Sequence, residues 1–429
     1  MALVPTELAI LKREKRFVVD YGFWSNHLLT DFKDDDNNAN AEDATDATYA
    51  WDNRFWLRAV WRPPADGSSQ NEQSLYLRVK DKLTWRDPAD ANGHQDHDGP
   101  HIDYLYGSLD FRPIWVQIGR RLFSVGQGIA YSNVNDGVEV LVARPAWTLM
   151  GFVSRTLPHE ENVDVSVPGG KNSGRTYYAL EGKYLGIRNH GVYGYVLFQQ
   201  DDADESLEDP VQDFAYDSQY VAIGSEGKLL ANLRYATELI LETGKSFRSG
   251  ADRQDRITAW ALDASATYDV QLPTQPTLFA QYAFGSGDSD RASVTDTIGG
   301  NSSGIDTNFL YFGYLPTGYA LSPRLSNLRM FKVGYSFKPL EKLRWFKEFT
   351  AGVDVYWYFK DEPAGGIFDA QASQTDRDVG SEIDLTLSWP ILSDLSATVE
   401  FGHFEPGKAY PATRNDPTEY AALSVTMTF

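Results

Sequence analysis

The chain has 429 residues, 60 acidic and 39 basic side chains, a net charge of −21 and no cysteine. The missing cysteines exclude disulfide frameworks and thiolate metal sites. The acidic balance argues against a nucleic-acid partner, which would need a basic surface. No window approaches the roughly 18 continuous apolar residues of a membrane helix, so a helical membrane protein is excluded.

The first long strands that the pattern predicts carry cations on one face. In the stretch 73–87, QSLYLRVKDKLTWRD, every second residue from Leu75 to Trp85 is apolar apart from Asp81, and the opposite face is polar. The stretch 53–62 alternates in the same way. Strict period two predicts strands with one apolar and one polar face. The cations on the polar faces are Arg54, Arg58, Arg78, Lys80, Lys82 and Arg86.

The alternation continues to the end of the chain, in runs longer than the five or six residues typical of strands in soluble proteins. Trp61, Trp85 and Trp389 lie near the ends of apolar faces, as in an interfacial aromatic girdle. We predict eighteen strands, near 16–28, 50–62, 74–86, 101–111, 114–122, 135–144, 146–156, 175–188, 190–200, 215–225, 228–242, 256–269, 277–286, 326–338, 348–360, 380–390, 394–404 and 418–429.

Long alternating strands separated by polar segments predict an all-β fold, a transmembrane antiparallel β-barrel with short periplasmic turns and long extracellular loops. We expect a single domain over residues 1–429, with 1–15 as an N-terminal periplasmic segment and the barrel over about 16–429. The first residues place an apolar patch before the charges, the reverse of a signal peptide, so an exported protein would be a processed chain. The last ten residues, YAALSVTMTF, alternate up to an aromatic residue and resemble the closing strand of bacterial outer-membrane proteins.

If the apolar faces meet lipid, the polar faces line an aqueous lumen. The early strands then form a cationic wall, and the later strands an acidic one. Such an arrangement predicts a transverse field that orients polar solutes. The alternative is that these charges pair with one another and stabilise the barrel. The later charges are Glu181, Glu238, Glu242, Asp263, Asp354, Glu382, Asp384 and Glu400, with Lys183, Arg234, Lys332 and Lys360 among them.

Five motifs carry a family resemblance: WVQIGRRLFSVGQG (115–128), YAFGSGDSD (282–290), LSPRLSNLRMFKVGYSF (321–337), DVGSEIDLTLSW (378–389) and VEFGHFEPGKAYP (399–411). Their order and spacing resemble the alginate export family, outer-membrane barrels through which bacteria secrete a polyuronate. The resemblance covers most of the chain from about residue 100. It implies a monomeric eighteen-stranded barrel with an arginine-rich constriction that passes an anionic polymer.

The resemblance also suggests individual pore residues. Arg120 follows Gly119 in the family's Gly-Arg motif, and Glu382 with Asp384 matches its acidic pair. Strict alternation from Ile118 would point Arg120 to lipid and Arg121 inward, whereas a bulge at Gly119 would reverse this. The strongly acidic half of the lumen departs from what a polyanion requires.

Metal and catalytic sites have weak signals. His94, His97 and His101 lie within eight residues, with Asp96 and Asp98 between them, but we expect a solvated polar loop rather than a metal site. The acidic stretches 32–38 and 285–290 lack the full spacing of a Ca²⁺ loop. We therefore expect no cofactor. No nucleophile elbow or dinucleotide fingerprint accompanies the remaining histidines and glycines, so we expect no enzyme.

The sequence therefore predicts a channel in the bacterial outer membrane for passive passage of an anionic or polar saccharide. The expected pore residues are Arg54, Arg58, Arg78, Lys80, Lys82, Arg86, Arg120, Arg121, Arg234, Glu382 and Asp384. The expected partners are outer-membrane lipid, the saccharide and a periplasmic export or envelope-complex protein. The alternatives are a general solute porin and a structural barrel that sheathes a partner protein. A barrel enzyme is a third option.

Overall fold

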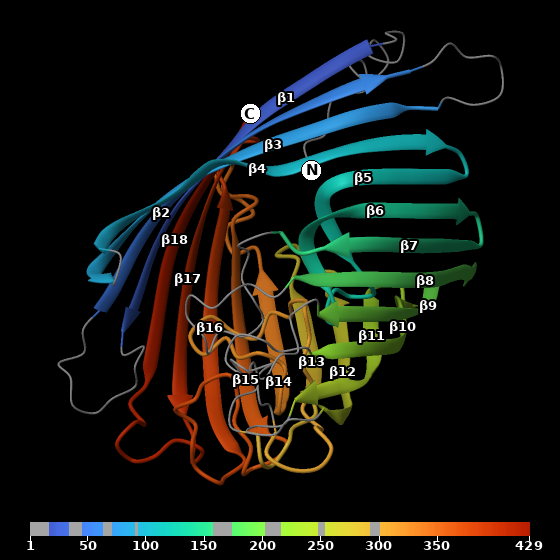
Figure 1. Ribbon diagram of the computed structural model, residues 1–429. Coiled ribbons are helices and arrows are strands. Elements are labelled where there is room, and N and C mark those ends of the chain that lie inside the picture. Colours follow the sequence, from blue (N-terminus) through green and yellow to red (C-terminus); the bar gives the residue numbers. More distant parts are fainter. Residues whose placement is uncertain are drawn as a thin grey trace.

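The strands close on themselves into a barrel (Figure 1). The computed structural model describes residues 17–33, 45–62, 71–90, 93–157, 174–201, 216–247, 254–291 and 301–429. Each strand is antiparallel to its sequence neighbours, and the first strand also pairs with the last, through Trp24–Lys33 and Glu419–Thr428. Closure leaves no free edge between the two ends of the sheet.

The eighteen predicted strands are confirmed, with different lengths. They are β1 (Phe17–Lys33), β2 (Thr45–Trp61), β3 (Gln73–Asp90), β4 (Gly93–Phe111), β5 (Ile114–Ser124), β6 (Ser132–Arg144), β7 (Trp147–Arg155), β8 (Arg175–Ile187), β9 (His190–Asp201), β10 (Asp217–Leu230), β11 (Leu233–Phe247), β12 (Gln254–Asp269), β13 (Thr277–Gly285), β14 (Leu328–Phe337), β15 (Thr350–Lys360), β16 (Asp378–Pro390), β17 (Leu395–Pro406) and β18 (Thr418–Thr428).

The largest difference from prediction is β4, which begins eight residues before residue 101. The segment 93–100 is polar and contains Gly99 and Pro100, so its side chains suggest a loop. Its backbone nevertheless pairs with β3 through three breaks in register, which follow Arg78, Lys80 and Trp85. Bulges of this kind accommodate extra residues within a sheet. The first bulge holds Asp103 as an extra residue, and the second sets Gly99 and Pro100 opposite Asp81.

The outer face of the barrel is apolar, as alternation predicts. Along β5, for example, Ile114, Ile118 and Leu122 are 40–49% exposed. Trp61 and Trp85 lie on the same outer surface, each toward the C-terminal end of its own strand, and are 51% and 37% exposed. Because β2 and β3 are antiparallel, the two indoles lie toward opposite ends of the barrel. Trp389 instead packs on Phe346, with ring centroids 4.6 Å apart. Within the described residues, no helix is long and apolar enough to cross a membrane.

The hydrophobic core lies inside the barrel. The described parts of the connection between β13 and β14, residues 286–291 and 301–327, turn into the lumen, and the segment 125–131 after β5 meets them there. Figure 1 shows the yellow and orange connecting segments inside the ring of strands. The buried cluster contains side chains from these segments, from β5 and β7–β17, and from the connections after β15 and β17, but no residue of β1–β4. The lumen therefore has a filled side and a side that this cluster does not cover.

Candidate channel lumen

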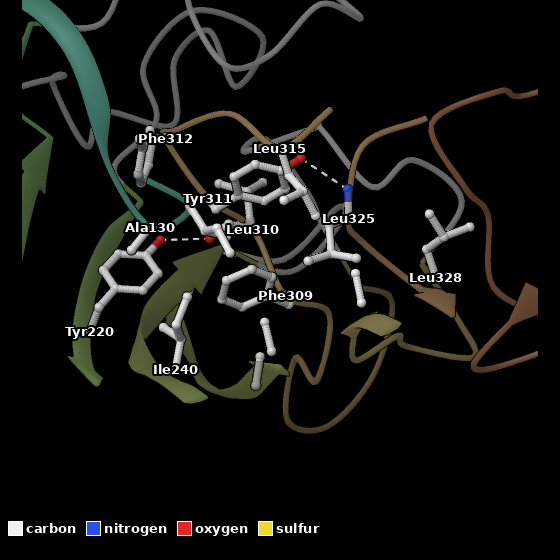
Figure 2. Close-up of a cluster of buried hydrophobic side chains, with 14 of the residues drawn as sticks. Ala130, Tyr220, Ile240, Phe309, Leu310, Tyr311, Phe312, Leu315, Leu325 and Leu328 are labelled. Carbon is white, nitrogen blue, oxygen red and sulfur yellow. Dashed lines mark hydrogen bonds between the residues drawn. The ribbon is translucent and has the colours of Figure 1, made fainter. Parts of the chain in front are cut away.

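The segment 306–321 crosses the filled side of the lumen. At one end Asp306 makes a parallel bridge with Ile257 of β12, and further along Phe312 bridges Tyr131. The cluster in Figure 2 surrounds this crossing. The Tyr220 hydroxyl donates to the Leu310 carbonyl at 2.6 Å, and the Leu325 N–H donates to the Tyr311 hydroxyl at 2.9 Å. Residues 301–327 are called the lumen loop below.

Acidic residues of the barrel wall anchor these segments. Glu238 accepts hydrogen bonds from Tyr193 at 2.6 Å, from Tyr195 at 2.8 Å and from the Gln127 N–H at 2.7 Å. Glu242 accepts from the Leu310 N–H at 2.9 Å. A loop inside a barrel must find partners for its backbone N–H groups. The wall carboxylates supply those partners.

Glu382 makes the densest of these contacts to the lumen loop. Its Oε1 accepts from the N–H groups of Tyr319 and Ala320, both at 2.7 Å, and its Oε2 accepts from the Leu321 N–H at 3.0 Å. Gly318 has φ +129°, and a Cβ there would lie 2.7 Å from Oε1, so glycine permits the close approach. Successive N–H groups converging on one anion form a backbone nest.

Burial corrects the prediction that the acidic pair lines the pore. Glu382 is fully buried and Asp384 is 1% exposed. Asp384 lies opposite Asp354 in the β15–β16 register, and neither of its carboxylate oxygens has a hydrogen-bond partner among the described residues. Glu238 and Glu242 are also buried, at 0% and 2% exposed. The prediction that they form part of an exposed acidic wall, and so of a transverse field, is therefore wrong. A sequence pattern places these residues inward but cannot say that a loop covers them.

Tyr319 links the lumen loop to two strands of the barrel, β16 and β18. Its hydroxyl bonds with Thr386 at 2.9 Å, and its ring lies 5.9 Å from that of Tyr420 on β18. Burial raises the pKa of Tyr319 to about 12. The hydroxyl is therefore neutral near pH 7 and can donate or accept a hydrogen bond.

The cations of the predicted wall lie on the polar faces of β2 and β3, and five of the six form ion pairs. Arg54 contacts Asp52 at 2.7 Å, Arg58 contacts Glu72 at 3.0 Å, and Arg86 lies 3.9 Å from Asp96. These distances join side-chain nitrogen to carboxylate oxygen. Such pairs neutralise much of the field that the same cations would produce alone. The wall is therefore a ladder of ion pairs.

Arg78 and Lys80 pair with carboxylates of the bulged β4. Arg78 donates to Asp103 at 2.6 Å, and its guanidinium lies 3.9 Å from the centroid of the Tyr104 ring. Lys80 contacts Asp98 at 2.8 Å, and Lys82 lies opposite Asp98 in the register. The bulge places Asp103 on the same face as its neighbour Tyr104. Simple alternation would not predict this acid, although Asp52 could have been found because it shares the parity of Arg54.

The other predicted arginines lie in three different places. Pairing of β5 with β4 and β6 is continuous, without a bulge at Gly119. Arg120 therefore shares the outer face with Ile118 and contacts Asp136 at 3.0 Å, which corrects its assignment to the pore. Arg121 points inward and contacts Glu139 at 2.7 Å. Arg234 lies beside Asp269 near the short-turn end of the lumen, 3.1 Å away.

The three histidines of the polar stretch have separate partners. His94 contacts the Arg86 carbonyl, His97 contacts Asp81, and His101 contacts Asp98. No group of three or more metal-ligating side chains occurs in the part of the chain that the structure describes. Of the first acidic stretch, 32–38, residues 34–38 lie outside the described residues.

The aspartates of the second candidate Ca²⁺ stretch bind the protein's own loop. Asp288 accepts from the Thr307 N–H at 2.9 Å, and Asp290 accepts from the Ser303 hydroxyl at 2.6 Å. Burial opposes the charge of Asp290, but the hydrogen bonds from Ser303 and Ser302 lower its pKa below the usual value. These carboxylates therefore hold the chain around residues 302–307 in place.

Solved structures with the same fold are outer-membrane proteins at low sequence identity. OccK5 (OpdH) of Pseudomonas aeruginosa superposes with a TM-score of 0.59 at 10% identity, over 96% of this chain and 98% of that one. OccAB4 of Acinetobacter baumannii gives 0.60 at 11% identity, with the same shares covered. The P. aeruginosa OpdK structure with vanillate gives 0.59 at 11% identity, again over 96% and 98%. At these identities the likeness establishes the fold alone.

Sequence comparison defines the family. No curated protein sequence matches the chain. The family model described as alginate export matches residues 34–423. That range includes nearly all of the barrel, the lumen loop and the paired cationic wall. The chain therefore belongs to the alginate export family, and it is a β-barrel channel of the bacterial outer membrane.

Proposed function

We propose that the channel passes an anionic or polar saccharide passively along the inner face of β1–β4. The observation that carries the proposal is the division of the lumen. Loop segments fill the side next to β5–β17, whereas the cations of β2 and β3 belong to the side that the buried cluster leaves uncovered. A solute on that side meets a series of guanidinium and ammonium groups. Several weak, closely spaced sites favour conduction over trapping.

The ion pairs of the wall are compatible with a saccharide substrate. A guanidinium has five N–H donors, and a carboxylate partner uses only some of them. The donors that remain can bind hydroxyls or carboxylates of a passing sugar. Exchange between an internal carboxylate and one on the substrate would change little in energy, because one ion pair replaces another.

A general solute porin is the second candidate, and the same ion pairs favour it. A wall whose cations already have carboxylate partners discriminates less between anions and cations than a wall of free charges. A third candidate, a structural barrel that sheathes a partner protein, is disfavoured because the lumen loop occupies space inside the barrel that such a partner would need.

Single-channel conductance in a planar bilayer separates the first two candidates. We expect an anion-selective reversal potential in a salt gradient, and we expect oligouronates to block the current. Replacing Arg78, Lys80 and Lys82 together by Ser should shift the reversal potential toward cations. The matched control is Arg120→Ser on the outer face, which should leave it unchanged. Open current without block by oligouronates would favour the general porin.

A further inference from the structure

Three aromatic rings form a strip on the inner face of β2–β4. The ring of Tyr76 lies between the other two. Its centroid is 6.3 Å from that of Trp56, with the planes 16° apart, and 5.3 Å from that of Tyr106, with the planes 32° apart. We call Trp56, Tyr76 and Tyr106 the aromatic strip.

Glycine holds the first ring flat against the wall. Gly22 of β1 lies opposite Trp56 in the β1–β2 register, and a Cβ at Gly22 would be 2.5 Å from the indole. The indole therefore lies close against the Gly22 backbone, where any larger side chain would displace it.

The strip is open where other lumen aromatics are covered. Trp56, Tyr76 and Tyr106 are each half-buried, whereas Tyr131 of the segment 125–131 and Tyr220 of β10 are 0% exposed. Those buried tyrosines hold the loop segments through hydroxyl contacts. The strip belongs to no such contact with the lumen loop in the described residues.

Arginine side chains border the strip at matching heights. Arg78 pairs with Trp56 across the β2–β3 register, and Arg58 pairs with Tyr76. Neighbouring rows are two residues apart along a strand, about 6.8 Å, which is comparable to the advance of one sugar unit. Each row thus offers one ring face and one guanidinium. The Arg58 side chain is 46% exposed and the Arg78 side chain is 21% exposed.

We propose that the aromatic strip is a stacking site for pyranose rings, neutral or acidic, and that it adds ring recognition to the charge recognition of the wall. The face of an aromatic ring is electron-rich, and the C–H groups on one face of a pyranose carry partial positive charge. A sugar ring can therefore lie on Trp56 or Tyr76 while its hydroxyls or carboxylate bind Arg78 or Arg58. This inference rests on the proposed saccharide function and names a ligand feature that charge alone does not require.

A neutral oligosaccharide tests the strip without involving substrate charge. The probe is cellohexaose, added to wild-type channels in a planar bilayer, with polyethylene glycol of matched mass as a control for size. We expect cellohexaose to block the current at concentrations where the glycol does not. Trp56→Leu and Tyr76→Leu should each weaken the block by roughly two- to tenfold, the range of one aromatic contact.

Two matched variants control for folding and for aromatic content. Tyr76→Phe keeps the ring and should keep the block. Trp357→Leu removes an indole from the outer face, where it is 41% exposed, and should also keep the block. If a variant does not insert, Tyr106→Leu and calorimetric titration of wild-type protein with cellohexaose supply the same comparison.

Equal block by cellohexaose and by the glycol in the wild type would overturn the stacking site. Loss of block in Trp357→Leu equal to that in Trp56→Leu would overturn it as well. Neither result would refute the proposed function, which is tested separately by anion selectivity and by block with oligouronates. Conversely, a channel blocked by cellohexaose but indifferent to oligouronates would keep the strip and refute the anionic substrate.

Discussion

The attachment of the lumen loop to Glu382 makes a quantitative prediction about conductance. Replacing Glu382 by Ala removes the acceptor of three backbone N–H groups, those of Tyr319, Ala320 and Leu321. A buried donor left without an acceptor costs about 1–3 kcal/mol. At the lower bound, the three together cost about 3 kcal/mol. That corresponds to a roughly hundredfold shift in the equilibrium between docked and undocked loop.

Single-channel recording measures this shift directly. We expect Glu382→Ala to give a larger mean conductance and more current noise than wild type, because the loop leaves its place in the lumen for part of the time. The matched control is Glu405→Ala on the adjacent β17, which removes a carboxylate whose side chain is 63% exposed. Conductance and noise equal to wild type in Glu382→Ala would refute the view that this carboxylate holds the loop.

Two further predictions concern ion pairs. Asp103→Asn frees Arg78 from its partner, so the reversal potential should shift toward anions in a salt gradient, and a shift toward cations would contradict the paired wall. Arg291 and Asp306 form an ion pair in which neither side chain is more than 1% exposed. Arg291→Met leaves Asp306 buried without this guanidinium, and loss of one partner of a buried pair costs about 3–5 kcal/mol. The barrel should then unfold at a lower temperature, measured by the loss of the compact band on gels, whereas an unchanged transition would show that the pair contributes little.

Most of the fold follows from local pattern. A strand in a barrel wall alternates lipid-facing and lumen-facing side chains, and this alternation is visible in sequence without knowledge of any contact. Strands such as β15 and β16 were therefore predicted within two residues at each end. The start of β4 was not, because bulges at Asp103 and at Gly99–Pro100 let a polar, glycine- and proline-containing segment remain in the sheet.

The candidate site was only partly predictable, for a related reason. Alternation gives the direction of Arg78 and Glu382, which is inward for both. It says nothing about what else is inside the barrel. Arg78 has the Asp103 carboxylate beside it, and the lumen loop covers Glu382. Alternation along a single strand predicts neither partner.

The sequence by itself determined the barrel, the direction of most strand side chains and the family. Those properties depend on period-two hydrophobicity and on motifs, which are local along the chain. Only the tertiary structure decided which side of the lumen the buried cluster fills, which charges are paired and that Trp56, Tyr76 and Tyr106 lie side by side. Strand register and the path of a loop through the lumen set these properties. Both arise from contacts between residues far apart in sequence, so no local pattern contains them.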